Sequence, residues 1–281
     1  MRRSLSPLIA FALSLNAFLS LANADDTTLK GAIWHKGDIR QGGLVTAQVP
    51  AGATVMLDDT PLPLSANHHI AFGFHRDDDK AQILTITTKD GTSYITTLFP
   101  EQRDYKTQTI NGLASKYVSP PQEVLDRIAR DRQKVATARA HLSYLDDFIT
   151  NGFDWPASGT ITGIYGSQRI LNGTPRAPHY GIDIAAPAGT PVLAPADGII
   201  TMADDLYYTG GTIIIDHGLH ISSTMLHLDM MTVSHGDKIK RGDVIGTIGS
   251  TGRSTGPHLD WRLNWGQKRL DPQLALVADE N

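Results

Sequence analysis

Residues 177–192 have the sequence APHYGIDIAAPAGTPV, in which Gly and Pro are too frequent for a long helix. The same character extends over residues 153–277, where Gly-rich turns separate short apolar runs. This spacing is typical of a compact antiparallel β-domain. The strands predicted for this domain are 159–165, 191–202, 212–216, 222–227, 244–248 and 258–264.

Two short motifs in this domain combine histidine with aspartate. His179 and Asp183 are an even number of residues apart, so on an extended chain both side chains could point the same way. In the segment STGPHLDWRLNW, His258 and Asp260 share one face of the last predicted strand for the same reason. Imidazole and carboxylate groups are ligands that first-row metals prefer. The four residues therefore form a candidate metal site, although spacing alone supports it only weakly.

Six of the eleven histidines fall in this domain. His227 lies between apolar neighbours on a predicted strand, which indicates a buried or cleft-facing imidazole. His217, His220 and His235 lie beside Gly or in turn-like contexts, and we expect structural or surface positions for them. His227 is therefore the additional histidine to consider for chemistry.

The first part of the chain, residues 28–112, is also predicted to be all-β. Gly, Pro and Asp residues punctuate its short apolar runs, as in a small β-sandwich or barrel. His68 and His69 could bind a metal, but an exposed turn is the favoured interpretation. The runs richest in β-branched residues are 53–57, 82–87 and 92–98.

Residues 119–149 change character, because apolar residues recur there at spacings of three, four and seven, as on a helix. Pro120 and Pro121 lie at its start, where a missing N–H is tolerated. An anion site on this helix is conceivable, but a solvated helix face is the favoured interpretation of its basic residues. These are Arg127, Arg130, Arg132, Lys134 and Arg139.

The start of the chain predicts export. Arg2 and Arg3 precede an apolar run of 14 residues, 8–21, and Ala22-Asn23-Ala24 forms a small-x-small cleavage site. The run is shorter than the roughly 20 residues that span a bilayer, which favours a cleaved signal peptide over a membrane anchor. We expect no stable membrane span after cleavage, and a location in the periplasm or cell envelope of a bacterium.

The net charge and the absence of cysteine argue against several classes of partner and active site. Removal of residues 1–24 leaves 23 basic and 29 acidic side chains, a net charge of −6 that argues against nucleic acid as the main partner. The absence of cysteine excludes a cysteine nucleophile and a thiolate zinc site. Nucleotide-binding glycine loops are also absent from the sequence.

Several motifs around the candidate ligands occur in an order typical of one family. They are GIDIAAPAGTPVLAPADGII, GGTIIIDHG, LHLD, HGDKIKRGDVIGTIGSTGRSTGPH and a late DP. From about Gly159 to Leu274 the chain closely resembles the catalytic domain of lysostaphin-type (LytM-like) zinc peptidases, and residues 28–112 are similar to the β-rich domain that precedes it in many bacterial members. The organisation that follows is a signal peptide (1–24), an N-terminal β-rich domain (25–118), a connecting helix (119–150) and a metallopeptidase domain (151–281).

The resemblance implies a cell-wall endopeptidase that cleaves peptidoglycan peptides with one Zn²⁺ in a groove on an antiparallel sheet. It assigns the zinc ligands to His179, Asp183 and Asp260. It also implies that His227 and His258 act around the catalytic water rather than on the metal.

Asp260 is a departure from the family pattern, which carries HxH where this chain has HxD. A carboxylate is a legitimate zinc ligand, so the site can survive. One neutral His, two Asp and Zn²⁺ sum to a charge of zero, whereas two His and one Asp would sum to +1. We expect a less positive centre to acidify its water less.

Two alternatives to an enzyme stay open. One is a non-catalytic LytM-like domain that binds cell wall or regulates another wall hydrolase, and the other is a structural, sugar-binding β-protein. Arg169 and Arg176 could engage a carboxylate of a stem peptide, but a solvated loop is favoured for both. A loop such as 168–172 could cover the metal, and Trp261 and Trp265 are expected to pack in the core or at a sheet edge.

Overall fold

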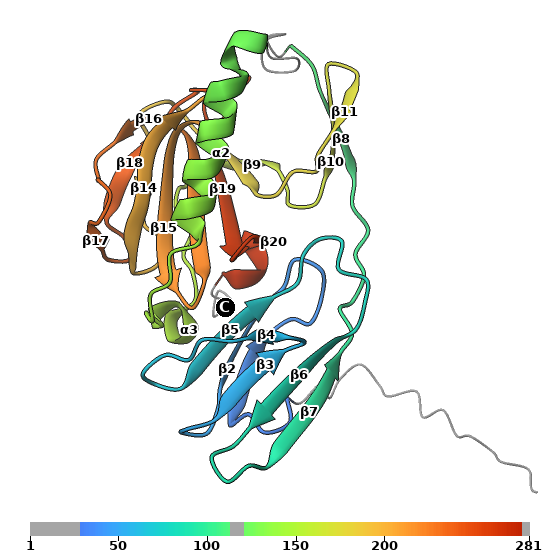
Figure 1. Cartoon of the computed structure of the whole chain (residues 1–281). Coiled ribbons are helices and arrows are strands. Elements are labelled where there is room, and N and C mark those ends of the chain that lie inside the picture. Colours follow the sequence, from blue (N-terminus) through green and yellow to red (C-terminus); the bar gives the residue numbers. More distant parts are fainter. Residues whose placement is uncertain (1–28, 113–120, 277–281) are drawn as a thin grey trace, which may run out of the picture.

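The computed structural model describes residues 29–112 and 121–276, so the predicted signal peptide lies outside the described residues. Two β-rich bodies lie end to end, and one long helix covers a face of the larger body (Figure 1). Named strands pair antiparallel, except that β8 and β10 are parallel, which confirms the predicted mainly β class. No helix in the described ranges is long and apolar enough to cross a membrane.

The smaller body contains two sheets, in the orders β1-β2-β5 and β4-β3-β6-β7. Buried and more exposed residues alternate along β6, because successive side chains point to opposite faces of a sheet. The buried faces enclose an apolar core that includes Val45, Phe72 and Leu84. The three predicted strands of this region are confirmed to within one residue. The strands are β1 Trp34–Gly37, β2 Leu44–Gln48, β3 Thr54–Leu57, β4 Thr60–Pro61, β5 His69–Gly73, β6 Gln82–Thr87 and β7 Ser93–Leu98.

His69 does not lie in the exposed turn that was expected for it. It belongs to β5, is only 8% exposed, and its Nδ1 lies 2.9 Å from Asp146 Oδ2. Asp146 also accepts a hydrogen bond from Ser65 Oγ at 2.7 Å. The contact between His69 and Asp146 therefore connects the smaller body to the segment that follows the long helix.

Further contacts join the two bodies. Leu44 packs into the core of the larger body. Arg103 pairs with the buried Asp271 at 2.9 Å, and Lys268 Nζ lies 2.8 Å from Asp78. The smaller body therefore supports the larger one from the side of its last strands.

The larger body is built on a ten-stranded sheet with the path β17-β14-β15-β16-β19-β12-β9, to which β13, β18 and β20 attach. The predicted strands are confirmed with shifted ends, except that 191–202 is wrong as a single strand. The chain bends at residues 195–197, and the two strands on either side pair with different neighbours, β13 with β18 and β14 with β15 and β17. The strands are β9 Thr160–Gly163, β12 Ile182–Ala185, β13 Pro191–Leu193, β14 Gly198–Leu206, β15 Gly210–Gly218, β16 Ile221–Met231, β17 Lys238–Ile239, β18 Val244–Ile248, β19 His258–Trp265 and β20 Lys268–Leu270, followed by the 3₁₀ turn η2 Pro272–Ala275.

Helix α2 (Leu125–Arg139), preceded by η1 (Gln122–Val124), is shorter than the predicted connecting helix. It crosses one face of the large sheet (Figure 1) and buries Ala138 against it. The residues that follow the helix lie against the β15–β16 turn, where Leu219 N donates to Ser143 O at 2.9 Å. A one-turn helix, α3 (Asp147–Asn151), follows.

A segment between the two bodies joins the larger one as a strand. β8 (Thr107–Ile110) pairs in parallel with β10 (Gln168–Leu171), which pairs antiparallel with β11 (Thr174–Arg176). Residues 168–171 are therefore a strand rather than the covering loop that was considered, and β8 reaches the neighbourhood of the candidate site.

His217 has the structural position expected for it. It is 1% exposed, its Nδ1 lies 2.7 Å from Asp197 O, and its Nε2 lies 2.9 Å from Ser223 Oγ. Nδ1–H therefore donates to the carbonyl and Nε2 accepts from the hydroxyl, as assigned from this network. Burial lowers the pKa of His217 to about 4, because the core disfavours the cation.

Acid should destabilise the fold through this histidine. A histidine in the unfolded chain has a pKa of about 6.5, so between pH 6.5 and 4 the unfolded state binds more protons. The stability present above pH 6.5 is lost as the pH falls toward 4, by about 3 kcal/mol. Urea unfolding at pH 7 and pH 4.5 measures this loss, and His217→Gln should make the decline shallower. Equal declines in both proteins would contradict the assignment.

Candidate metal centre

His179, Asp183 and Asp260, the predicted metal ligands, lie together on one face of the large sheet. Asp183 on β12 and Asp260 on β19 are directly opposite in the antiparallel register, which places both carboxylates on the same face. His179 precedes β12, and its Nε2 lies 3.1 Å from Asp183 Oδ1. One ligand atom from each residue lies within 4.8 Å of the others, which is compact enough for a single ion.

Unpartnered polar atoms at this centre fit a metal ion. Nδ1 of His179, which is 1% exposed, is buried without a hydrogen-bond partner. Nε2 of His179 and Oδ1 of Asp183 are also buried, and although they lie 3.1 Å apart they form no hydrogen bond. Buried polar atoms are nearly always hydrogen-bonded, because an unpaired one costs about 1–3 kcal/mol. Zn²⁺ takes imidazole nitrogen and carboxylate oxygen as ligands, so one ion would satisfy these atoms.

Each carboxylate of the centre is also paired with an arginine. Arg262, two residues after Asp260 on β19, donates through Nη2 to Asp260 Oδ2 at 2.6 Å and through Nε to Oδ1 at 3.0 Å. Arg169 on β10 donates through Nη2 to Asp183 Oδ2 at 2.8 Å. The side chain of Arg169 is 15% exposed, so the solvated-loop interpretation is wrong for this residue.

These arginines change the charge of the centre. The three predicted ligands and Zn²⁺ sum to zero, but Arg169 and Arg262 in contact with the carboxylates raise the sum to +2. Burial opposes ionisation of Asp260, yet Arg262 and His179 outweigh it and hold the pKa of that carboxyl well below its usual range. Asp183 shows the same direction, since His179 and Arg169 outweigh its burial. Both side chains are thus carboxylates at neutral pH, and the two guanidinium groups add positive charge beside the predicted ligands.

Two glycines leave room for the carboxylates. A Cβ atom on Gly163 would lie 2.2 Å from Asp183 Oδ2, and one on Gly181 would lie 2.5 Å from Asp260 Oδ1. Gly163 is the register partner of Asp183 across β9 and β12. Spacing in the sequence does not indicate this role, because the contact forms between neighbouring strands.

Gly163→Ala should displace the Asp183 carboxylate and weaken zinc binding by about 10–100-fold, the usual cost of disturbing the support of a ligand. Competition with a chromophoric chelator measures the affinity. Gly246→Ala is the matched control, because a Cβ at Gly246 of β18 would lie 2.4 Å from Met230 O, a similar overlap away from the lining of the metal-centre cavity. Equal zinc affinities in the two variants would exclude a role for the small residue at 163.

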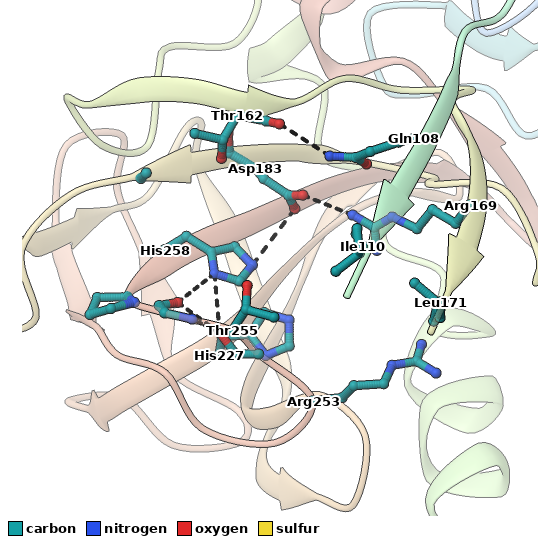
Figure 2. Close-up of a pocket in the computed structure, with 14 residues that line it drawn as sticks. Gln108, Ile110, Thr162, Arg169, Leu171, Asp183, His227, Arg253, Thr255 and His258 are labelled. Carbon is teal, nitrogen blue, oxygen red and sulfur yellow. Dashed lines mark hydrogen bonds and ion pairs between the residues drawn. The ribbon is translucent and has the colours of Figure 1, made fainter. Parts of the chain in front are cut away.

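His227 and His258 lie side by side next to the centre, with ring centroids 4.8 Å apart (Figure 2). The Nδ1 atom of His227 lies 2.8 Å from Thr251 O, and burial lowers the pKa of His227 to about 4. The Nδ1 atom of His258 lies 2.8 Å from Gly256 O, and its Nε2 lies 3.8 Å from Asp183 Oδ1. In each neutral ring Nδ1–H therefore donates to a carbonyl, which leaves Nε2 as the basic nitrogen.

Asp183 and the two histidines line an open cavity of about 300 Å³ (Figure 2). Strand β8 supplies Gln108 and Ile110 to its wall, and Gln108 Nε2 donates to Thr162 O at 3.3 Å. No motif in the sequence indicated these two residues, because they come from the segment that joins the two bodies. Arg169 and Arg253 also line the cavity and make it basic.

Residues 177–272 match the model of Peptidase family M23. Over 87 residues the chain is 45% identical to peptidoglycan DD-endopeptidase ShyA of Vibrio cholerae, a match that covers 31% of this chain and 20% of ShyA. Over 103 residues it is 42% identical to DD-carboxypeptidase/endopeptidase Mpg of Neisseria meningitidis, covering 36% of this chain and 24% of Mpg. The matches thus span about a fifth to a quarter of the length of these curated relatives.

A solved structure from Pseudomonas aeruginosa, assigned to peptidase M23, superposes with a TM-score of 0.65 and 24% identity over 84% of this chain and 94% of that chain. This likeness shows a common fold. The family match covers His179, Asp183, His227, His258 and Asp260. The domain that carries these five residues belongs to peptidase family M23, the lysostaphin-type (LytM-like) family.

Proposed function

We propose that this chain is an exported zinc metallo-endopeptidase that hydrolyses peptide bonds in peptidoglycan cross-links or stem peptides. The observation that carries the proposal is the set of unpartnered atoms on His179 and Asp183 that face Asp260. Similarity to relatives named peptidoglycan DD-endopeptidases supports the substrate class.

His179, Asp183 and Asp260 would hold one Zn²⁺ per chain. Zinc, when bound, would supply Lewis acidity toward a scissile carbonyl and an attacking water. His227 is neutral at pH 7 because its pKa is about 4, so its Nε2 can accept a proton. The ring of His258 lies against that of His227, and its Nε2 can also accept a proton. Once protonated, that nitrogen can donate a hydrogen bond to charge that develops on the substrate.

Metal content and wall digestion test the proposal together. The purified chain should contain about one zinc per molecule by mass spectrometry and release peptides from purified peptidoglycan. A chelator should stop the release, and added zinc should restore it. Protein that holds no stoichiometric zinc and leaves cross-linked wall peptides intact would contradict the enzyme.

One observation favours a second candidate, a non-catalytic domain that binds the wall or regulates another wall hydrolase. Arg262 and Arg169 already neutralise the two carboxylates without a metal. A non-catalytic domain predicts that wall binding is unaffected by a chelator and by His179→Ala. The enzyme predicts that zinc and wall digestion are lost together in that variant.

Export and the domain division belong to the same proposal. Cleavage after residue 24 should give a mature chain that begins at Asp25 in the periplasm or cell envelope. Domain limits of 25–118, 119–150 and 151–281 remain our prediction for the mature chain and its connecting segment. Intact-mass measurement of protein from the cell envelope, compared with the cytoplasm, tests the cleavage site.

A further inference from the structure

A second cavity, of about 280 Å³, lies between α2 and the large sheet. Arg139 of α2, Arg262 of β19 and Arg269 of β20 line it, and we call it the arginine pocket. Because Arg262 follows Asp260 by two residues on β19, the arginine pocket opens on the same sheet face as the metal centre, roughly 7 Å along the strand.

The arginine pocket and the cavity at the metal centre are neighbours. Arg253, which lines the cavity beside the histidines, lies with its guanidinium carbon 4.9 Å from the centre of the Tyr208 ring. Tyr208 lines the arginine pocket. This cation–π pair therefore forms part of the wall between the two cavities.

Arg139 is buried in the arginine pocket without a carboxylate partner. It is 6% exposed, so the solvated helix face expected from the sequence is wrong for this residue. Its Nη2 donates to Thr224 Oγ1 at 3.3 Å, and its Nε has no hydrogen-bond partner. Across residues 29–112 and 121–276, the ion pairs of the structure include none with Arg139.

The neighbourhood of the other two arginines offers no spare carboxylate to compensate the charge of Arg139. Arg262 is already paired with Asp260, and Arg269 donates to a neutral amide, Asn264 Oδ1, at 3.1 Å. Burial and the nearby Arg269 and Arg262 lower the pKa of Arg139 well below its ordinary value. Within the described residues, Arg139 and Arg269 therefore carry two positive charges that form no ion pair with a carboxylate. Arg132, an exposed residue of α2 that also lines the pocket, adds a further positive charge.

One acidic side chain, Asp131, also lines the arginine pocket, but its carboxylate interacts with groups other than the three arginines. Asp131 accepts a hydrogen bond from Tyr207 N at 2.8 Å and lies 3.9 Å from Arg127. An anion from outside the chain would complement the excess positive charge of Arg139 and Arg269.

We propose that the arginine pocket binds an oxyanion of the carboxylate or phosphate type, held chiefly by Arg139 and Arg269. The planar guanidinium fork matches the oxygens of such groups. The anion could be a carboxylate of a wall peptide that also reaches the metal centre, or a free inorganic oxyanion. The first source rests on the proposed function, whereas the oxyanion site itself does not.

Isothermal titration of the full chain with inorganic phosphate tests the site. A chelator first removes metal, so that phosphate cannot bind zinc. Arg139→Gln should bind phosphate at least 10-fold more weakly than the wild type, and Arg139→Lys should fall between them. Arg130→Gln, the same change on the exposed side of α2, should leave the affinity unchanged.

A second arm distinguishes the sources of the anion. A wall stem peptide with a free C-terminal carboxylate is compared with its carboxamide, and a preference for the free acid that disappears in Arg139→Gln identifies the peptide as a ligand. A phosphate effect alone supports the site with a free oxyanion as its occupant. These binding readouts need no catalysis, so failure of the peptidase proposal leaves them interpretable.

Thermal unfolding measurements distinguish a loss of the binding site from a loss of the fold. Without phosphate, Arg139→Gln should unfold at the same or a higher temperature than the wild type, because a buried unpaired charge is removed. Phosphate should raise the unfolding temperature of the wild type but not of the variant. If Arg139→Gln does not fold, Arg269→Gln takes its place. Phosphate and peptide affinities that do not depend on Arg139 or Arg269 would overturn the proposal.

Discussion

Asp260→Ala should abolish zinc binding and lower the free energy of unfolding by about 3–5 kcal/mol, the cost of breaking a buried ion pair. Asp260 is 1% exposed, and in the described part of the chain it is the only ion-pair partner of Arg262. Alanine therefore removes a ligand and also leaves a guanidinium uncompensated. Zinc content by mass spectrometry and unfolding in urea report the two effects separately.

Two companion variants separate the ligand from the ion pair. Asp260→His should retain zinc, because imidazole is a zinc ligand, although Arg262 loses its partner. Asp260→Ala combined with Arg262→Met should recover much of the stability but not the zinc, since the unpaired charge is gone and the ligand is still missing. Equal zinc content in the wild type and Asp260→Ala would show that Asp260 is not a ligand.

His227→Asn should lower kcat for wall-peptide hydrolysis by about 10²–10⁴-fold without loss of zinc, the usual contribution of a general acid–base group. Asparagine is preferred to alanine because His227 has a φ of 67°, a left-handed conformation that asparagine tolerates. Hydrolysis of a defined cross-linked peptide, followed by chromatography, gives kcat.

His220→Asn provides the matched control for this variant. His220 has a nearly identical φ of 65° but lies in the turn between β15 and β16, away from the lining of the metal-centre cavity. Its kcat should equal that of the wild type. Equal losses in the two variants would attribute the effect of His227→Asn to the fold rather than to proton transfer.

Local patterns were sufficient for the β class and for a set of four candidate residues, from which the resemblance to the family selected three as ligands. Alternation along β6 and the even spacing of His258 and Asp260 both follow from the two-residue period of a strand. The same period could have indicated Arg262, because it lies two residues beyond Asp260 on β19. What spacing did not indicate was that its guanidinium turns back onto that carboxylate.

These sequence patterns did not predict contacts between segments that are far apart along the chain. Arg169 of β10 contacts Asp183 of β12 although the two strands belong to different sheets, and Gln108 lines the same cavity because β8 pairs with β10. Helical periodicity placed Arg139 on a helix, but its burial depends on which face of α2 meets the sheet.

The sequence by itself determined the chemical types at the centre, one imidazole and two carboxylates with a pair of histidines beside them, because these are carried by short motifs of fixed spacing. Only the tertiary structure decided the charge around them. Arg169, Arg262 and the arginine pocket are assembled from β10, β19, β20 and α2, and Coulomb energy depends on distances in space rather than on separation along the chain.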